Sequence, residues 1–391
     1  MEKLSHTFAF EQANLKNMGF WDNGSSQYYK MYSWAMWILF IYVFDFFQVM
    51  FLTNATDVED ISAGLSIVIS EIILIHKLHV FRGYLPRIEK LVEVLDSDDF
   101  WPKCPEEWKV ANDSKFKMKV LFRFYHCAGY AAIILYMFVP IIQGTAVLFT
   151  PAWYPWDISQ TKIFVATYIY QAIGTYILAT AVMAYDSIVC CLLLHGDLQY
   201  KRLQIMLRKL GHEPPTGLAN TEVAETPTNR KRCIYYNEMV KCILFHKNVN
   251  EFIGEVENIF KDGNFTHFVA SSSVICMTLY DLITTTDDNV LVYISRMVYL
   301  TGLTFELFLF CYGGYEVTYS SSQLVYSAFS SDFLKFDKAT AQLLQIFMLR
   351  TTRERTIKAG SIISLSLNLN TFLQLMKSSY TFLAVLQSLQ P

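Results

Sequence analysis

Residues 32–52 read YSWAMWILFIYVFDFFQVMFL and contain one charged side chain, that of Asp45. An α-helix needs about 20 mainly apolar residues to cross roughly 30 Å of hydrocarbon. This stretch is long enough to cross a membrane, and further stretches of similar character follow it. They are residues 61–81, 124–149, 163–193, 265–286, 289–312 and 362–386. Lipid offers no hydrogen-bond partners to open backbone groups, so each stretch is expected to be helical.

The composition points the same way. Hydrophobic residues make up 53% of the 391 residues and aromatic residues 16%, whereas only 17% are charged. This is more apolar surface than a soluble fold of ordinary composition carries. The sequence therefore predicts an all-α membrane protein with seven transmembrane helices.

The lysines and arginines are distributed unevenly along the chain. Of these 32 residues, 28 lie before the first expected helix, or in and beside the connections between helices two and three, four and five, and six and seven. Positive charge near membrane helices stays on the cytoplasmic side. The N-terminus is therefore expected in the cytoplasm and, after seven crossings, the C-terminus is expected to be extracellular.

The tripeptide Asn54-Ala55-Thr56 is an acceptor sequence for N-glycosylation, and the expected topology places it outside the cell. Two similar tripeptides begin at Asn112 and Asn264, but the same topology places them on the cytoplasmic side. Asn54 is therefore the predicted glycosylation site.

The cytoplasmic segments are long and carry apolar stripes. Residues 84–119 and 232–262 have amphipathic helical spacing, whereas residues 211–231 are rich in Pro, Thr, Asn and Glu and are predicted to form a flexible loop. The expected organisation is membrane helices one to four with cytoplasmic helix 84–119 in residues 1–195, a cytoplasmic anchor region in residues 196–264, and membrane helices five to seven in residues 265–391. The apolar stripes need a partner, which is either the same chain or a neighbouring subunit.

The sequence gives no support to an enzyme. It contains no His-Glu-x-x-His zinc pattern and no glycine-rich phosphate loop. Glu71, His76 and His79 lie in the second expected helix, but Glu71 is poorly spaced for a metal site with the two histidines. With Lys77 and Arg82 they are interpreted as polar side chains that reach the headgroups at the inner membrane edge. We expect no cofactor, no metal and no nucleic acid as a partner.

The last expected helix is unusually polar, with Asn370, Gln374, Lys377 and Ser378 among its residues. A polar stripe on a membrane helix suits a water-filled path, or close packing through small polar side chains. One such helix cannot enclose a pore, but several copies around an axis can. The candidate pore and gate residues, near the outer end of this helix, are Val385, Leu386 and Gln387.

The outer halves of the middle helices are rich in aromatic and small polar residues, which suit an apolar cavity for a small volatile ligand. The candidate ligand-binding residues are Tyr136, Phe138, Pro140 and Gln143 in the third helix, Phe164, Tyr168, Gln171 and Thr175 in the fourth, and Met277, Thr278 and Tyr280 in the fifth. For each of them, ordinary packing between helices is the alternative interpretation.

Three short motifs stand near the C-terminus. They are Cys311-Tyr312-Gly313 followed by Glu316 and Ser320 to Ser322, then Lys358-Ala359-Gly360, and then Thr371-Phe372 with Lys377-Ser378-Ser379-Tyr380-Thr381-Phe382. These motifs resemble those of the insect odorant receptors. The family often has an aromatic residue and Trp after the serine cluster, where this chain has Phe329-Ser330-Ser331-Asp332-Phe333.

The resemblance implies a ligand-gated, nonselective cation channel in the plasma membrane of sensory neurons. It implies a heterotetramer with a shared coreceptor, embedded in membrane lipid, with the pore lined by the last helix. It also implies a pocket for an odorant or pheromone in the outer half of the helices. The long insertion that marks the coreceptor between helices four and five is missing, so the chain resembles a ligand-selective subunit.

Other classes of membrane protein are alternatives. A gustatory receptor of the same superfamily is the nearest, but residues 377–382 resemble the odorant type. A G-protein-coupled receptor has its N-terminus outside the cell, contrary to the charge distribution of this chain. A transporter is expected to show internal repeats, and none is visible in the sequence.

Overall fold

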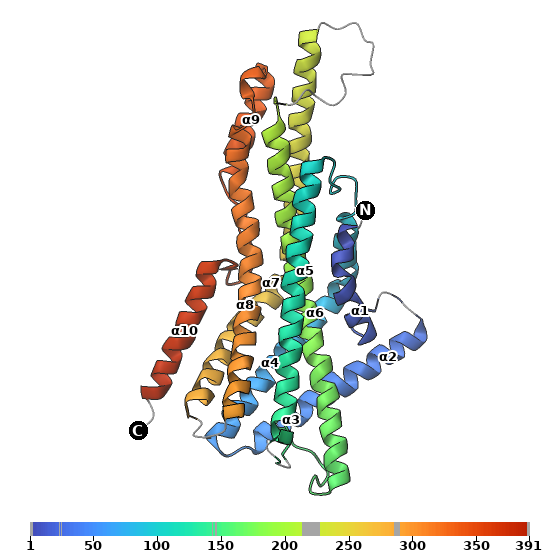
Figure 1. Ribbon diagram of the computed structural model, residues 1–391, viewed down its shortest axis with the longest axis vertical. Coiled ribbons are helices and arrows are strands. Elements are labelled where there is room, and N and C mark those ends of the chain that lie inside the picture. Colours follow the sequence, from blue (N-terminus) through green and yellow to red (C-terminus); the bar gives the residue numbers. More distant parts are fainter. Residues whose placement is uncertain are drawn as a thin grey trace.

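The computed structural model describes residues 3–22, 24, 26–142, 144, 147–212, 227–284 and 290–388. In chain order its elements are η1 (Leu4–Phe8), α1 (Ala9–Asn17), α2 (Gln27–Trp37), η2 (Ile38–Tyr42), α3 (Val43–Asn54), α4 (Val58–Val94), α5 (Pro105–Ile142), α6 (Thr161–Lys209), α7 (Pro227–Thr284), α8 (Val290–Phe329), η3 (Phe333–Lys335), α9 (Lys338–Thr351), β1 (Lys358–Ala359), β2 (Leu365–Ser366) and α10 (Leu369–Ser388). The long helices run along one elongated bundle (Figure 1).

Within the described residues, six helical stretches are long and apolar enough to cross a membrane. They are Gln27–Asn54, Gly64–Val94, Pro105–Ile142, Thr161–Lys209, Ile234–Ile283 and Val290–Phe329, and they overlap the first six expected spans. The first stretch joins α2 and α3 through the π-helix η2. Helix α10 has 20 residues, which is also enough to cross, and it corresponds to the seventh span.

Helix α6 forms the centre of the bundle. Every residue from Met183 to Tyr200 is buried, and the helix packs against α5, α7 and α8. The surrounding helices instead expose large apolar side chains, such as Phe46, Ile134 and Ile169. A helix that is apolar all round belongs in the interior, and exposed apolar side chains in such number suit contact with lipid.

The upper half of the bundle in Figure 1 is made by the parts of α5–α8 that extend beyond the membrane spans, together with α9. Most lysines and arginines lie in this half, which identifies it as cytoplasmic. The extension of α6 ends at Lys209, just before the predicted loop 211–231, and Gly211 follows with a φ of +85°. A glycine in this left-handed conformation is a common end to a helix.

Arg202 fixes the cytoplasmic extension of α6 to the first turn of α5 and to the connection that precedes it. Its side chain is buried and its guanidinium donates to Glu107 Oε2 at 2.8 and 2.9 Å and to the carbonyl oxygen of Trp101 at 2.7 Å. A buried guanidinium is tolerated when its charge and its donors are matched in this way.

Three expected boundaries differ from the structure. Residues 84–119 do not form one helix, because α4 ends at Val94 and α5 begins at Pro105. Helix α5 ends at Ile142 rather than at 149, and Gly144 follows with a φ of +66°. The expected loop 211–231 is interrupted by the start of α7 at Pro227, and its residues 213–226 lie outside the described residues.

A fourth difference concerns the last helix, which begins at Leu369 instead of 362. The residues before it form the antiparallel hairpin of β1 and β2, in which Lys358 pairs with Ser366. Asn368 then caps α10, because its Oδ1 accepts a hydrogen bond from the backbone nitrogen of Thr371 at 2.8 Å. A side chain that accepts from this position satisfies one of the free donors at a helix start.

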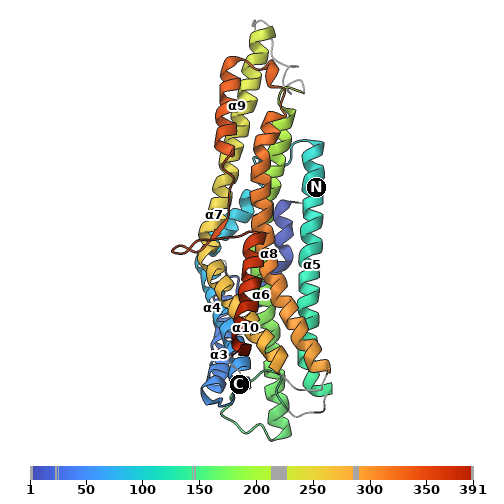
Figure 2. The same cartoon turned by 90° about the vertical axis from the view of Figure 1, so that its left-hand side faces the viewer.

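Helix α10 lies on the outside of the bundle, against α7 and α8 (Figures 1 and 2). Thr371, Ser379 and Leu383 are buried against these neighbours. The polar residues of α10 recur on the opposite, exposed face, which carries Asn370, Gln374, Lys377, Ser378 and Thr381. The spacing of three and four residues places them in one stripe that points away from the rest of the chain.

Candidate ligand cavity

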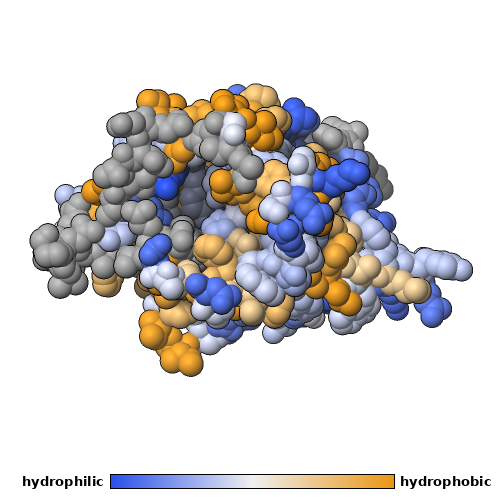
Figure 3. Space-filling model, turned by 90° about the horizontal axis from the view of Figure 1, so that it is seen from below, coloured by the Kyte–Doolittle hydropathy of each residue, from blue (hydrophilic) through white to orange (hydrophobic). Residues whose placement is uncertain are grey.

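A cavity of about 510 Å³ lies among helices α4–α8 in the membrane-spanning half, and the connection between α5 and α6 contributes residues 148–151 to its wall. This volume falls within the range of about 300–1,000 Å³ that is usual for small-molecule sites. Seen from the extracellular end, the surface of the molecule is hollowed, and apolar side chains lie beside the hollow (Figure 3).

The wall of the cavity is mainly apolar. Tyr136 of α5 and Phe149 of the α5–α6 connection meet edge to face, with ring centroids 6.0 Å apart. Further apolar lining comes from five helices and comprises Ile73, Leu74, Ile133, Val139, Leu178, Val182, Met183, Val274, Val298 and Leu303. Such a wall suits a small apolar ligand, because binding removes the apolar surfaces of both the ligand and the wall from water, which lowers the free energy.

The cytoplasmic end of the cavity is charged. Lys77 of α4 donates to Asp186 Oδ1 of α6 at 2.8 Å and to Glu306 Oε1 of α8 at 3.0 Å. The ring nitrogen Nε2 of His267 lies 3.3 Å from the same Glu306 oxygen, and the hydroxyl of Tyr125 donates to Asp186 Oδ2 at 3.3 Å. These five residues, from five helices, form what is here termed the buried charge cluster.

The buried charge cluster is closely packed on the side away from the cavity. The ammonium of Lys77 lies 5.4 Å from the centre of the Tyr185 ring and 5.6 Å from that of Phe310. A cation over aromatic faces gains electrostatic stabilisation that adds to its two ion pairs. Lys77, Tyr125, His267 and Glu306 also line the cavity. A ligand at this end therefore meets fixed polar groups. The remaining wall is mainly apolar, although Glu71, Asp281 and Arg296 also line it.

The structure brings four of the candidate ligand-binding residues to the cavity wall, namely Tyr136, Pro140, Thr175 and Thr278. Four others do not line it: Phe138 is 51% exposed, and Phe164, Met277 and Tyr280 also lie elsewhere. Gln143 lies outside the described residues.

Two candidate residues support the wall from behind. Tyr168 packs edge to face on Phe149 with centroids 5.1 Å apart, and its hydroxyl donates to the carbonyl oxygen of Met137. Gln171 is buried, and its Nε2 donates to the carbonyl oxygen of Thr150 at 3.0 Å. Both therefore fix the α5–α6 connection, and Phe149 and Thr150 of that connection line the cavity.

Sequence reasoning missed the buried charge cluster, and its interpretation of Lys77 was wrong. Lys77 is 1% exposed and does not reach the headgroups. A usable signal was present, because Asp186 and Glu306 stand in apolar helices as well. Opposite charges inside membrane spans are costly when alone and tend to pair with one another.

The other candidate positions lie apart from this cavity. Val385, Leu386 and Gln387 belong to the last turns of α10, and their side chains lie outside the described residues. Asn54 is the last residue of α3 and is exposed. Its Nδ2 donates to the carbonyl oxygen of Met50 at 2.7 Å.

Known proteins resemble this chain in sequence and in fold. A family model described as "7tm Odorant receptor" matches residues 57–380. The chain is 33% identical to odorant receptor Or1 of Anopheles gambiae, over 96% of this chain and 94% of that protein. It is 26% identical to odorant receptor 33a of Drosophila melanogaster, over 78% and 77% of the two chains.

The fold is similar to that of the insect olfactory receptor OR5 from Machilis hrabei, which was solved in complex with eugenol. The TM-score is 0.83 at 16% sequence identity, and the match covers 99% of each chain. The relatives are receptors and not enzymes, and the prediction of an all-α membrane protein with seven transmembrane helices is confirmed. This multi-pass membrane protein therefore belongs to the insect odorant receptor family.

Proposed function

We propose that the chain is the ligand-selective subunit of an odorant-gated, nonselective cation channel in the plasma membrane of sensory neurons. A small volatile odorant or pheromone binds in the cavity among α4–α8. The observation that carries this proposal is the cavity itself, with about 510 Å³ enclosed by five helices and a charged inner end. The solved relative named above was obtained with a small aromatic compound, eugenol.

The position of α10 supports the channel part of the proposal. The helix is buried on one face against α7 and α8, and its exposed stripe of Asn370, Gln374, Lys377, Ser378 and Thr381 points away from the chain. A polar stripe is unfavourable against lipid, so it needs water or other subunits. Several subunits around an axis give it both, with Val385, Leu386 and Gln387 near the constriction.

The partner subunits in this proposal are coreceptor chains of the same family. The segment between α6 and α7 is short, since α6 ends at Lys209 and α7 begins at Pro227. It has no room for the long insertion that marks the coreceptor in the family that this chain resembles. The short segment therefore supports the proposal that the chain is a ligand-selective subunit.

The experiment is co-expression with a coreceptor, followed by current recordings against a panel of odorants. Tyr136→Ala removes an aromatic wall from the cavity and is expected to raise the half-maximal odorant concentration about tenfold or more. Phe138→Ala is the matched control, because this residue lies two positions along α5 with its side chain facing outward.

Surface labelling of both variants keeps expression separate from binding. A concentration shift in Tyr136→Ala alone supports the cavity as the odorant site. Equal shifts in both variants, or none in either, would place the odorant elsewhere. If the wild-type pair gives no current with any odorant, the channel proposal itself is contradicted.

A further inference from the structure

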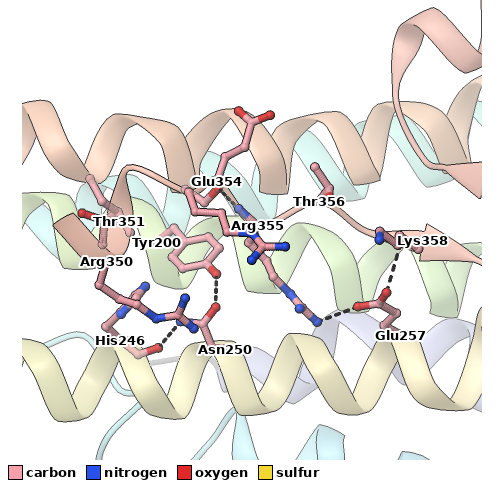
Figure 4. Close-up of a pocket in the computed structure, with 13 residues that line it drawn as sticks. Tyr200, His246, Asn250, Glu257, Arg350, Thr351, Glu354, Arg355, Thr356 and Lys358 are labelled. Carbon is pink, nitrogen blue, oxygen red and sulfur yellow. Dashed lines mark hydrogen bonds and ion pairs between the residues drawn. The ribbon is translucent and has the colours of Figure 1, made fainter. Parts of the chain in front are cut away.

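A second cavity, of about 350 Å³, lies in the cytoplasmic half and shares no lining residue with the odorant cavity. It is enclosed by α6, α7, α8, α9 and the segment that leads from α9 to β1 (Figure 4). Its floor is buried and is made by Tyr200, Ser321, Leu324 and Thr351. The floor is also ordered by hydrogen bonds, because the hydroxyl of Tyr200 donates to Asn250 Oδ1 at 2.9 Å.

The rim of this cytoplasmic cavity is basic. Four cationic side chains line it, those of Arg350, Arg353, Arg355 and Lys358, against two carboxylates, those of Glu257 and Glu354. Arg355 pairs with Glu257, with Nη2 and Oε2 2.5 Å apart. The surplus of positive charge is therefore carried mainly by Arg350, Arg353 and Lys358.

The guanidinium groups at the rim retain free donors. Among the described residues, Arg350 and Arg353 make no hydrogen bond or ion pair, and the Nε of Arg355 is buried without a partner. Figure 4 shows Arg350 and Arg355 both directed toward α7, on the side of Asn250 and Glu257. A buried donor without a partner costs free energy, and a bound acceptor would remove that cost.

His246 adds no positive charge to this rim at neutral pH. Burial, together with the nearby Arg350, lowers the pKa of His246 to about 4. The imidazole is therefore neutral and can accept or donate a hydrogen bond at the wall. The attraction for an anion comes from the three arginines and Lys358.

We propose that this cavity binds a small anion that carries several phosphate groups, such as an inositol phosphate. Arginine presents planar forks that match phosphate oxygens with two parallel hydrogen bonds. Several arginines on one rim favour several phosphates over a single one. The volume of about 350 Å³ lies at the lower end of the range for small-molecule sites, which suits a ring of this size.

The same chemistry is available from a soluble inositol phosphate and from the headgroup of a phosphoinositide lipid. Glu257 lies eight residues before Phe265, where the fifth membrane span was expected to begin, which is about 12 Å along the helix. The membrane-proximal end of the cavity is thus within reach of a lipid headgroup. The opposite end, at His246, lies further into the cytoplasm.

The bound anion would act on the segment that leads into α10. Residues 352–357 join α9 to β1, and the hairpin of β1 and β2 ends three residues before α10 begins. The backbone nitrogen of Lys358 donates to Glu257 Oε1 at 3.2 Å, so this segment already rests on α7. An anion that bridges Arg350, Arg355 and Lys358 holds it there more firmly.

The test measures binding of inositol hexakisphosphate to the purified full-length chain in detergent, and needs no odorant. The double variant Arg350→Gln with Arg353→Gln removes two phosphate ligands and is expected to bind about tenfold or more weakly. Lys338→Gln is the matched control, since it removes an exposed charge from the first residue of the same helix, α9. Thermal unfolding of each variant without ligand checks that it is folded.

A second arm distinguishes the two sources of the anion. The chain is placed in nanodiscs that contain phosphatidylinositol bisphosphate, or phosphatidylserine at equal total charge. Selective retention of the bisphosphate lipid by the wild type, lost in the double variant, assigns the site to a lipid headgroup. Binding of the soluble compound alone assigns it to a cytosolic anion. Absence of binding in both arms, or equal binding by wild type and double variant, overturns the proposal.

Discussion

At the level of single residues, Lys77 determines the charge balance inside the membrane-spanning half. Its ammonium faces two carboxylates, Asp186 and Glu306, and all three side chains are nearly or fully buried. The group therefore sets one lysine against two acidic side chains. Removal of one partner from a buried ion pair is strongly destabilising, because the other charge stays buried without compensation.

This imbalance predicts different costs for two similar substitutions. Lys77→Met leaves two facing carboxylates and is expected to destabilise the protein by about 3–5 kcal/mol. Glu306→Gln keeps a balanced Lys77–Asp186 pair and an oxygen that accepts from Lys77, so its cost is expected to be smaller. Thermal unfolding of the detergent-solubilised variants, followed by size-exclusion chromatography, measures both. A larger loss for Glu306→Gln would contradict the assigned charges.

Glu11 provides a test of pH dependence outside the membrane spans. It lies on α1 with its side chain buried, and burial raises its pKa to about 7. In the unfolded chain the carboxyl ionises near 4.5, so the folded state retains the proton over the window from about 4.5 to 7. The stability that this proton provides is complete below the lower value and is lost as the pH rises through the upper one.

Glu11→Gln is therefore expected to stabilise the protein at pH 8 by up to about 3 kcal/mol and to have little effect near pH 4.5. Unfolding midpoints of the two proteins across this range measure the difference. Glu93→Gln, at an exposed position of α4, is the matched control. A constant difference between wild type and Glu11→Gln at all pH values would show that the carboxyl does not titrate as expected.

At the level of elements, the beginning of α10 depends on how closely α8 approaches it. A methyl group added at Gly314 of α8 would overlap the carbonyl oxygen of Leu367 and come within 2.6 Å of its Cβ. Leu367 precedes α10 by two residues, and its backbone nitrogen donates to the carbonyl oxygen of Ile357 at 2.8 Å. The contact therefore fixes the hairpin and the start of the helix together.

Gly314→Ala is expected to displace this junction and to reduce odorant-evoked current in the proposed channel, with a destabilisation of about 1–3 kcal/mol. Gly83→Ala in α4 is the control, because a methyl group there meets no atom within 4 Å. Alanine is also the better helix former at an unstrained position. Currents normalised to surface expression measure the effect. Equal currents from Gly314→Ala and wild type would separate the junction from gating.

The sequence predicted some element boundaries well because the signals are local. The loop predicted from residue 211 onward agrees with the end of α6 at Lys209, because Gly211 takes a positive φ there. The start of α10 was missed because Ile362 and Ile363 continue the apolar pattern into the hairpin. The capping hydrogen bond of Asn368 shows that a polar residue at that position was the better signal.

At the level of the whole molecule, hydropathy and charge predicted the fold but not which helix faces meet. Tyr136 and Phe138 stand two residues apart in α5, and only Tyr136 lines the cavity. In a bundle surrounded by lipid, apolar side chains face both inward and outward, so apolarity does not reveal the rotation of a helix. Charged residues inside spans are more informative, because they must find partners, as Lys77 does.

The orientation of the whole molecule can be tested at Asn54. With the N-terminus inside, Asn54 is expected to carry a glycan, so Asn54→Gln increases gel mobility and abolishes the further shift caused by glycosidase. Asn112 is the matched control, since it stands in a similar tripeptide and its side chain is also exposed. Accessibility therefore does not distinguish the two sites, and only the side of the membrane does. A glycan on Asn112, with none on Asn54, would invert the topology and place the basic extensions of α5–α8 outside the cell, against the charge rule on which the orientation rests.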